Sequence, residues 1–158
     1  MNMKKILKLW LLCSSLLLAT EGTTSYGIGL GQLYNGVGIN IASHETSSMK
    51  SIAFGCMDIA YGTYSGFNAS CGFSIAYVST RIFEENNNHH GLGVHVGITK
   101  DSDAFAGSVG VGYSYFFDEI ANKGLNIGLT PTLLFRESTI NRKNDNELLL
   151  LLNLGYQF

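Results

Sequence analysis

The sequence predicts an all-β fold, a closed eight-stranded antiparallel up-and-down β-barrel that spans a membrane. From Tyr26 onward, large apolar residues alternate with small or polar ones in segment after segment, which is the period of a β-strand. The nineteen glycines and single proline favour strands joined by tight turns over a disordered chain. The final segment, 148–158, has a large apolar residue at every even position and ends on Phe158, which is typical of a lipid-facing strand.

Four strands are expected in the first half of the chain. The segment 26–30 alternates Tyr, Ile and Leu with glycine, and Asn35-Gly36 is a strong hairpin-turn signal. The segment 37–42 repeats this alternation after the turn. The segment 49–61 is the least regular of the expected strands, whereas 67–77 again places large apolar residues at alternate positions.

Four more strands are expected in the second half, at 92–99, 105–117, 125–135 and 148–158, each bounded by polar turn residues. Pro131 removes a backbone donor inside the third of these segments, which is unusual for a strand with two neighbours. An even number of strands allows an antiparallel meander to close on itself. Closure matters in a membrane because lipid offers no hydrogen-bond partner to an open sheet edge.

Aromatic residues sort into two belts when both termini are placed on the periplasmic side. Amphipathic rings settle at the two membrane–water interfaces, so two belts around an aliphatic band indicate a membrane barrel. The expected periplasmic belt comprises Tyr26, Tyr77, Tyr113, Tyr115, Tyr156 and Phe158, and the expected outer belt comprises Tyr34, Tyr61, Tyr64, Phe67, Phe105 and Phe135.

The chain divides into an export signal and one domain. Residues 1–22 combine three early lysines with an apolar run that is too short to span a bilayer, which predicts a cleaved signal peptide with its cleavage site between 19 and 25. Residues 23–158 form the expected barrel, and export together with a barrel predicts the outer membrane of a Gram-negative bacterium. Seven basic and twelve acidic residues lie beyond Thr20, and this negative balance disfavours a nucleic-acid partner.

The last seven residues carry a resemblance to a known class of proteins. Leu152, Leu154, Tyr156 and Phe158 alternate with smaller or polar residues up to the C-terminus, and this segment is similar to the signal that outer-membrane assembly machinery recognises. Over residues 26–158 the chain resembles the small eight-stranded outer-membrane barrels of the OmpA and OmpX type. The resemblance implies contacts with outer-membrane lipid and lipopolysaccharide, although the expected outer turns are shorter than in those barrels.

Two features could carry chemistry or structure inside the barrel. The inward-facing residues are mainly Gly, Ala, Ser, Thr and Asn, so the interior either holds an acyl chain or water path, or is flattened, plugged or hydrated. His95 is the one histidine expected to face inward on a regular strand, as a polar luminal site, a base or a proton-sensitive gate. The adjacent His89 and His90 lack further ligands at metal-binding spacing, so we expect a polar turn there.

Cys56 and Cys71 become opposed when the chain folds about the turn at 62–66. An exported protein permits a disulfide there, and two small apolar thiols facing lipid are the alternative. A bridge between these cysteines would have a structural role.

The leading functional hypothesis is a non-enzymatic outer-membrane barrel with a structural or surface-interaction role and no cofactor. The alternatives are a lipid A-modifying or acyl-chain-binding barrel like PagP or PagL, or a small pore. An enzyme needs a nucleophile, a base and an orienting group within reach of one another, and the spacing of Ser43, His44 and Glu45 establishes no such geometry. An eight-stranded wall is too narrow for a wide pore.

Overall fold

The computed structural model describes residues 22–62, 66–83, 88–100, 104–138 and 144–158. Side chains are described for 22–57, 69–83, 88–100, 105–135 and 146–158. The expected signal peptide, 1–22, lies outside these ranges except for its last residue. Within the described ranges, no helix has the length and apolar character that a helical membrane span requires.

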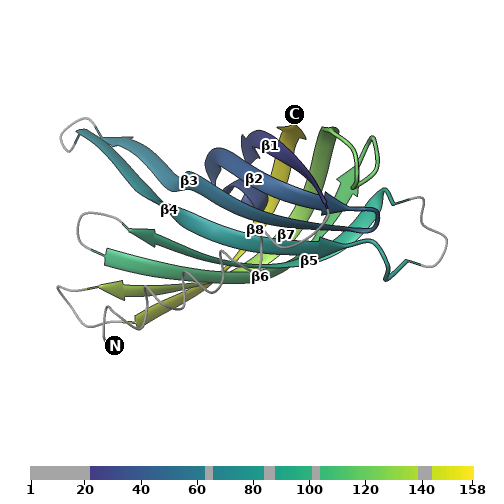
Figure 1. The fold of residues 1–158 in the computed structure, drawn as a ribbon. Coiled ribbons are helices and arrows are strands. Elements are labelled where there is room, and N and C mark those ends of the chain that lie inside the picture. The colour runs from purple at the N-terminus through teal and green to yellow at the C-terminus, as the bar shows by residue number, and fades with distance from the viewer. Residues whose placement is uncertain (1–21, 63–65, 84–87, 101–103, 139–143) are drawn as a thin grey trace, which may run out of the picture.

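The chain forms a closed barrel in which each strand pairs antiparallel with the strand before and after it, and β1 pairs with β8 (Figure 1). This confirms the predicted eight-stranded up-and-down barrel. The strands are β1 (Thr23–Leu30), β2 (Val37–Glu45), β3 (Ser48–Gly62), β4 (Gly66–Ser79), β5 (His90–Lys100), β6 (Ala104–Phe116), β7 (Gly124–Ser138) and β8 (Asn144–Gln157). One short 3-10 helix, η1 (Gln32–Tyr34), lies between β1 and β2.

The strands are strongly staggered around the barrel. Following paired residues from Tyr156 through β1 and each strand in turn leads back to β8 at Asn146, ten positions earlier in the same strand. This stagger requires the strands to tilt against the barrel axis, as closure of a narrow barrel demands. We call the end where β1 begins and β8 ends the terminal end, and the opposite end, with the β3–β4 and β7–β8 connections, the far end.

The alternation along each strand separates an apolar outer face from a small and polar inner face. Large apolar side chains point outward on all eight strands, with exposed fractions from 36% at Leu133 to 70% at Leu148. Inward positions include Asn126 and Thr132, both at 0%, and Ser51 at 1%. The inside–outside assignment made from the two-residue period is therefore confirmed for the described side chains.

Pro131 lies where the ladder between β6 and β7 is interrupted. The register pairs Gly110 with Thr132 and then Tyr113 with Leu129, and no pair involves Pro131 on this side. On the other side Pro131 is opposite Leu150 of β8. The proline therefore interrupts one ladder locally without ending the strand.

The β1–β2 hairpin is much shorter than the strands beside it. β1 pairs with β8 only from Leu30 opposite Leu154 to Gly27 opposite Gln157. β2 pairs with β3 no further than Val37 opposite Cys56. Beyond this hairpin, the far ends of β3 and β4 run to the upper left of Figure 1, and those of β7 and β8 run to the lower left. Among the described residues, the wall is therefore incomplete at the far end, because no strand lies between β8 and β3 there.

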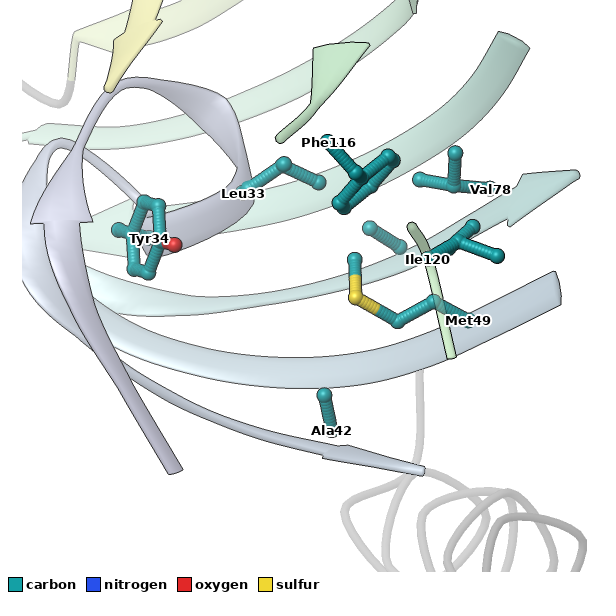
Figure 2. Close-up of a cluster of buried hydrophobic side chains, with 8 residues drawn as sticks. Leu33, Tyr34, Ala42, Met49, Val78, Phe116 and Ile120 are labelled. Atoms are coloured by element: carbon teal, nitrogen blue, oxygen red, sulfur yellow. The ribbon is translucent and has the colours of Figure 1, made fainter. Parts of the chain in front are cut away.

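The terminal end holds the main group of buried apolar side chains (Figure 2). Ile120, from the β6–β7 connection, is fully buried, and its amide donates to the carbonyl of Asn88 at 2.8 Å. The amide of Phe116 likewise donates to the carbonyl of His89 at 2.8 Å. These two hydrogen bonds join the β4–β5 connection to the end of β6 and the β6–β7 connection. The group comprises Leu33, Tyr34, Ala42, Met49, Ala76, Val78, Phe116 and Ile120.

Candidate functional site

The barrel interior is occupied by its own β1–β2 connection, residues Gly31–Gly36, which we call the luminal segment. Asn35 and Gly36 turn the chain with φ values of 57° and 96°, conformations that asparagine and glycine adopt most readily. The amides of Tyr34 and Gly36 donate to the carbonyl of Gly31 at 3.1 and 2.9 Å. The predicted Asn35-Gly36 turn is correct, but the residues before it fold inward and do not cap the outside of the wall.

Tyr34 lies at the centre of the luminal segment and is fully buried. Its placement in the outer aromatic belt was therefore wrong. The ring fits because Gly29 and Gly155 face it from neighbouring strands, and a Cβ atom on either glycine would overlap the ring. Small inward residues thus make room for a plug supplied by the chain itself. This matches the plugged interior that was one of the alternatives from the sequence.

The Tyr34 hydroxyl is held by side-chain amides from β7 and β8. It accepts from Asn126 Nδ2 at 2.9 Å and from Gln157 Nε2 at 3.3 Å, and donates to Asn126 Oδ1 at 3.3 Å. Gln157 Nε2 also donates to Asn40 Oδ1 at 3.1 Å, while Asn40 Nδ2 donates to the carbonyl of Leu33 at 3.2 Å. This network joins β2, β7 and β8 through one tyrosine.

Gln32 and Asn35 anchor the two ends of the plug. The Gln32 amide donates to Asn153 Oδ1, and its side-chain Nε2 donates to Ser108 Oγ at 3.0 Å. Asn35 Nδ2 donates to the carbonyl of Gly55 at 3.2 Å. Polar groups of β3, β6 and β8 therefore provide hydrogen-bond partners for the luminal segment. Without them, polar groups of this segment would be buried in the barrel without partners.

Ser25 and His44 form a buried pair at the terminal end. Ser25 Oγ lies 2.6 Å from His44 Nε2 and 2.9 Å from Gln157 Oε1, two acceptors that share the single proton of the serine hydroxyl. His44 Nδ1 contacts the carbonyl of Ile120, so this nitrogen carries the proton. The distance suits a nucleophile and its base, but both side chains are 3% exposed and the third partner is a backbone carbonyl. The arrangement joins β1, β2 and the β6–β7 connection.

Sequence reasoning considered His44 beside Ser43 and Glu45 but missed its actual partner. Ser25 lies nineteen positions away and meets His44 because Thr24 and Ser43 are opposite each other in the β1–β2 ladder. Glu45 is used elsewhere, in an ion pair with Lys50 at 3.0 Å. The separation of Ser25 and His44 in the sequence does not identify them as a pair. The two-residue alternation predicts only that both side chains face the inside of the barrel.

His95 faces inward, as the alternation predicted, and is 4% exposed. Its ring lies over Gly110, where a Cβ atom would overlap it. Among the residues whose side chains are described, His95 Nε2 and Gln32 Oε1 have no hydrogen-bond partner. Both residues line a cavity of about 10 Å³ that also touches Ser114 and Thr130. A cavity of this size has room for about one water molecule, which would join the two orphaned atoms.

Cys56 and Cys71 face each other directly across β3 and β4 and are joined by a disulfide. Their neighbours on the outward face, Phe54 and Phe73, are also paired, with ring centroids 5.0 Å apart. The bridge lies at the last position where β3 is paired with β2. It therefore fastens the β3–β4 hairpin where β3 loses its other neighbour.

The two remaining described histidines, His89 and His90, make hydrogen-bond contacts at the terminal end. His89 Nδ1 lies 2.6 Å from the carbonyl of Phe116, and His90 Nδ1 lies 2.6 Å from the Tyr113 hydroxyl. Among the residues whose side chains are placed, no three His, Cys, Asp or Glu are close enough to hold a metal ion.

The C-terminal residues face outward, with exposed fractions of 57% for Leu152, 40% for Leu154, 45% for Tyr156 and 55% for Phe158.

No known protein family, curated protein or solved structure matches this chain.

Proposed function

We propose that this chain is an integral outer-membrane β-barrel protein with a structural or surface-interaction role and no catalytic activity. It is exported by its N-terminal signal, inserted by the assembly machinery that reads its C-terminal strand, and surrounded by outer-membrane lipid and lipopolysaccharide. The observation that carries this proposal is the apolar outer face, which is continuous over eight strands. Water-soluble monomers rarely expose so large a contiguous apolar surface.

The filled interior favours a structural role over a pore. The luminal segment crosses the barrel, the cavity beside it has room for about one water molecule, and Ile120 is fully buried at the terminal end. An ion would have to displace the hydrogen-bonded plug to pass. The strands are separated by only three residues at 63–65 and at 101–103 and by five at 139–143, which is little chain for an adhesive surface, so envelope structure is the favoured role.

Acyl-chain binding is the second candidate, and one observation favours it. Apart from the apolar group at the terminal end, the inner face is small and polar except at Leu134, Leu149 and Leu151, which lie near the far end beside the incomplete wall. A lipid tail entering there would contact leucine. Acyl transfer is less favoured, because Ser25 and His44 are buried at the opposite end of the barrel and neither residue lines the cavity beside His95.

Vesicle flotation and gel migration test the leading proposal. The refolded protein should float with phospholipid vesicles, resist extraction by carbonate, and migrate differently on a denaturing gel before and after boiling. Lipid A from cells with and without the protein should have the same mass spectrum. A detergent-free soluble monomer would contradict membrane insertion, and a changed lipid A mass would replace the structural role with an enzymatic one.

A further inference from the structure

The Cys56–Cys71 disulfide lies on the outer face of the wall, well away from the terminal end. Phe54 and Phe73, two positions along the same strands, are exposed on the outer face, so the cysteines face outward as well. Tyr77, which belongs to the expected periplasmic belt, lies six positions from Cys71 on β4. At about 3.3 Å per residue on a strand tilted by about 40°, the bond lies roughly 15 Å from the level of Tyr77.

The bond also lies short of the outer aromatic level. Cys71 is opposite Lys100 of β5, and Lys100 is opposite Phe105 of β6, which belongs to the expected outer belt. Because the strands tilt, these two ladder steps of about 4.8 Å each place Phe105 roughly 6 Å nearer to the far end. Lys100 Nζ lies 5.4 Å from the centre of the Phe105 ring, so the lysine carries its charge toward that level. The disulfide is therefore between the two belts and nearer to the outer one.

This position, taken together with the proposed function, separates the bond from the compartment in which disulfides are made. With the terminal end in the periplasm, hydrocarbon covers the outward cysteines and most of the bilayer lies between them and the periplasm. The Phe54 and Phe73 rings, 5.0 Å apart, cover the periplasmic side of the bond. Disulfides of exported proteins form by exchange with oxidising thiol partners in the periplasm. Such a partner has no aqueous route to these cysteines after insertion.

We propose that Cys56 and Cys71 are oxidised in the periplasm before the barrel enters the membrane, by a partner protein that donates its own disulfide. The thiolate of one cysteine attacks the partner's disulfide, which forms a mixed disulfide and releases one partner thiolate. The other cysteine then attacks the sulfur of the first, which closes the bond and releases the second partner thiolate. The two electrons and two protons that the chain loses leave the partner as a dithiol.

Closure at this stage fixes the register of the β3–β4 hairpin before lipid surrounds it. The ladder is regular from Ser48 opposite Ser79 to Met57 opposite Ser70, and the register shifts between Met57 and Ala60. The disulfide lies one pair before this shift. A slip by one residue would turn the outward apolar side chains of a strand inward. The bond excludes that slip at the place where the ladder becomes irregular.

Pulse labelling in a Gram-negative host that exports the full chain tests the order of events. One part of each sample is denatured in acid and its free thiols are tagged with a maleimide polymer, while the other part is run unboiled to detect the closed barrel. The disulfide should appear before the heat-modifiable barrel. Without the host's periplasmic disulfide oxidase, the oxidised and unfolded intermediate should be lost. Closed barrels that still carry free thiols in the normal host would overturn the inference.

Vesicles test the access of the oxidant directly. Reduced protein inserted into phospholipid vesicles is exposed to oxidised glutathione, and the remaining thiols are alkylated and counted by mass. The matched control replaces both native cysteines with serine and carries Lys50→Cys and Tyr77→Cys, an outward opposed pair six positions nearer the terminal end on each strand. The native pair should oxidise at least about tenfold more slowly than the control pair, because a charged oxidant is excluded from hydrocarbon. Equal rates would overturn the inference.

The reverse reaction keeps the inference testable if the reduced chain fails to insert. Oxidised protein in vesicles is treated with a charged, water-soluble phosphine. The Cys56–Cys71 bond should survive in the inserted protein and break once the protein is unfolded. Rapid reduction in the inserted protein would show that aqueous reagents reach the bond and would overturn the inference.

Failure of this inference differs from failure of the proposed function on which it rests. A chain that inserts into vesicles while its cysteines exchange freely with aqueous reagents is still a membrane barrel, and only the early oxidation is lost. A chain that stays soluble in both the reduced and the oxidised state would remove the proposed function itself.

Discussion

At the scale of single residues, glycine positions decide what the interior can hold. Gly155 and Gly29 leave the volume that the Tyr34 ring occupies, and Gly110 leaves room for His95. Tyr34 is then fixed by Asn126 and Gln157, whose amides would otherwise be buried without this partner. The plug is therefore specified by a few side chains on different strands and not by one motif.

Filling the glycine site should release the plug. Gly155→Ala places a methyl group against the Tyr34 ring, and overpacking of this kind costs about 1–3 kcal/mol. Unfolding by guanidinium in vesicles should show the loss. Gly107→Ala is the control, because a Cβ atom there meets no neighbour within 4 Å and should change stability little. Equal stability of both variants would argue that Tyr34 does not occupy the lumen.

Removing one hydroxyl should test the network separately from the ring. Tyr34→Phe keeps the packing but leaves the Asn126 and Gln157 amides short of a partner, a loss of about 1–3 kcal/mol. Tyr26→Phe is the matched control, since Tyr26 is 62% exposed on the outer face. Guanidinium unfolding of the two variants should therefore differ clearly, and matching midpoints would contradict the network.

The strands were largely predictable from the sequence because the two-residue period needs only local information. The Asn35-Gly36 turn was predictable for the same reason, since its φ values suit those residues. The inward course of Gln32–Tyr34 was not, because it depends on space left by Gly155, more than a hundred positions away. The Ser25–His44 contact likewise requires the ladder register and the position of Ile120.

At the scale of elements, the short β1–β2 hairpin determines the shape of the whole wall. The hairpin supplies the plug and stops before it reaches the far end of the barrel. β3 and β8 therefore become edge strands over part of their length. The disulfide lies at this transition in β3. An isolated two-stranded ribbon is only marginally stable, so the β3–β4 extension depends on this covalent tie.

Loss of the disulfide should loosen one hairpin and little else. The bridge spans fifteen positions, and closing a loop of this length contributes about 3 kcal/mol in the chain-entropy description. Replacing Cys56 and Cys71 together with serine should speed amide exchange in the far part of β3 and β4, while β5 and β6 keep their protection. Exchange by mass spectrometry resolves these segments, and uniform exchange throughout would contradict a local role.

At the scale of the whole molecule, a filled barrel with an apolar exterior should insert without conducting. Planar bilayers containing the protein should stay silent. Replacing Gln32, Tyr34 and Ile120 with glycine removes two side chains of the plug and the side chain fully buried at the terminal end, so this variant should produce ion steps. Steps from the unmodified protein would restore the pore hypothesis.

The depth of each outward residue should determine how well it tolerates charge. Val111 lies in the middle of β6 and is 59% exposed, so Val111→Arg should cost about 2–4 kcal/mol in vesicles. Phe117, 49% exposed at the terminal end, should tolerate arginine at about 0–1 kcal/mol. Equal costs at the two depths would speak against a bilayer around this barrel.

The most direct test of the central claim is spin-label accessibility in vesicles at Val94, Val111 and Leu152, with Ser108 and Thr132 as inward controls. Labels on the three outward positions should collide freely with oxygen and hardly at all with a water-soluble nickel complex, because hydrocarbon surrounds them. Labels on the inward controls should be shielded from both reagents by the filled interior. Outward labels that collide with nickel as readily as with oxygen would show that water, and not lipid, covers the apolar face.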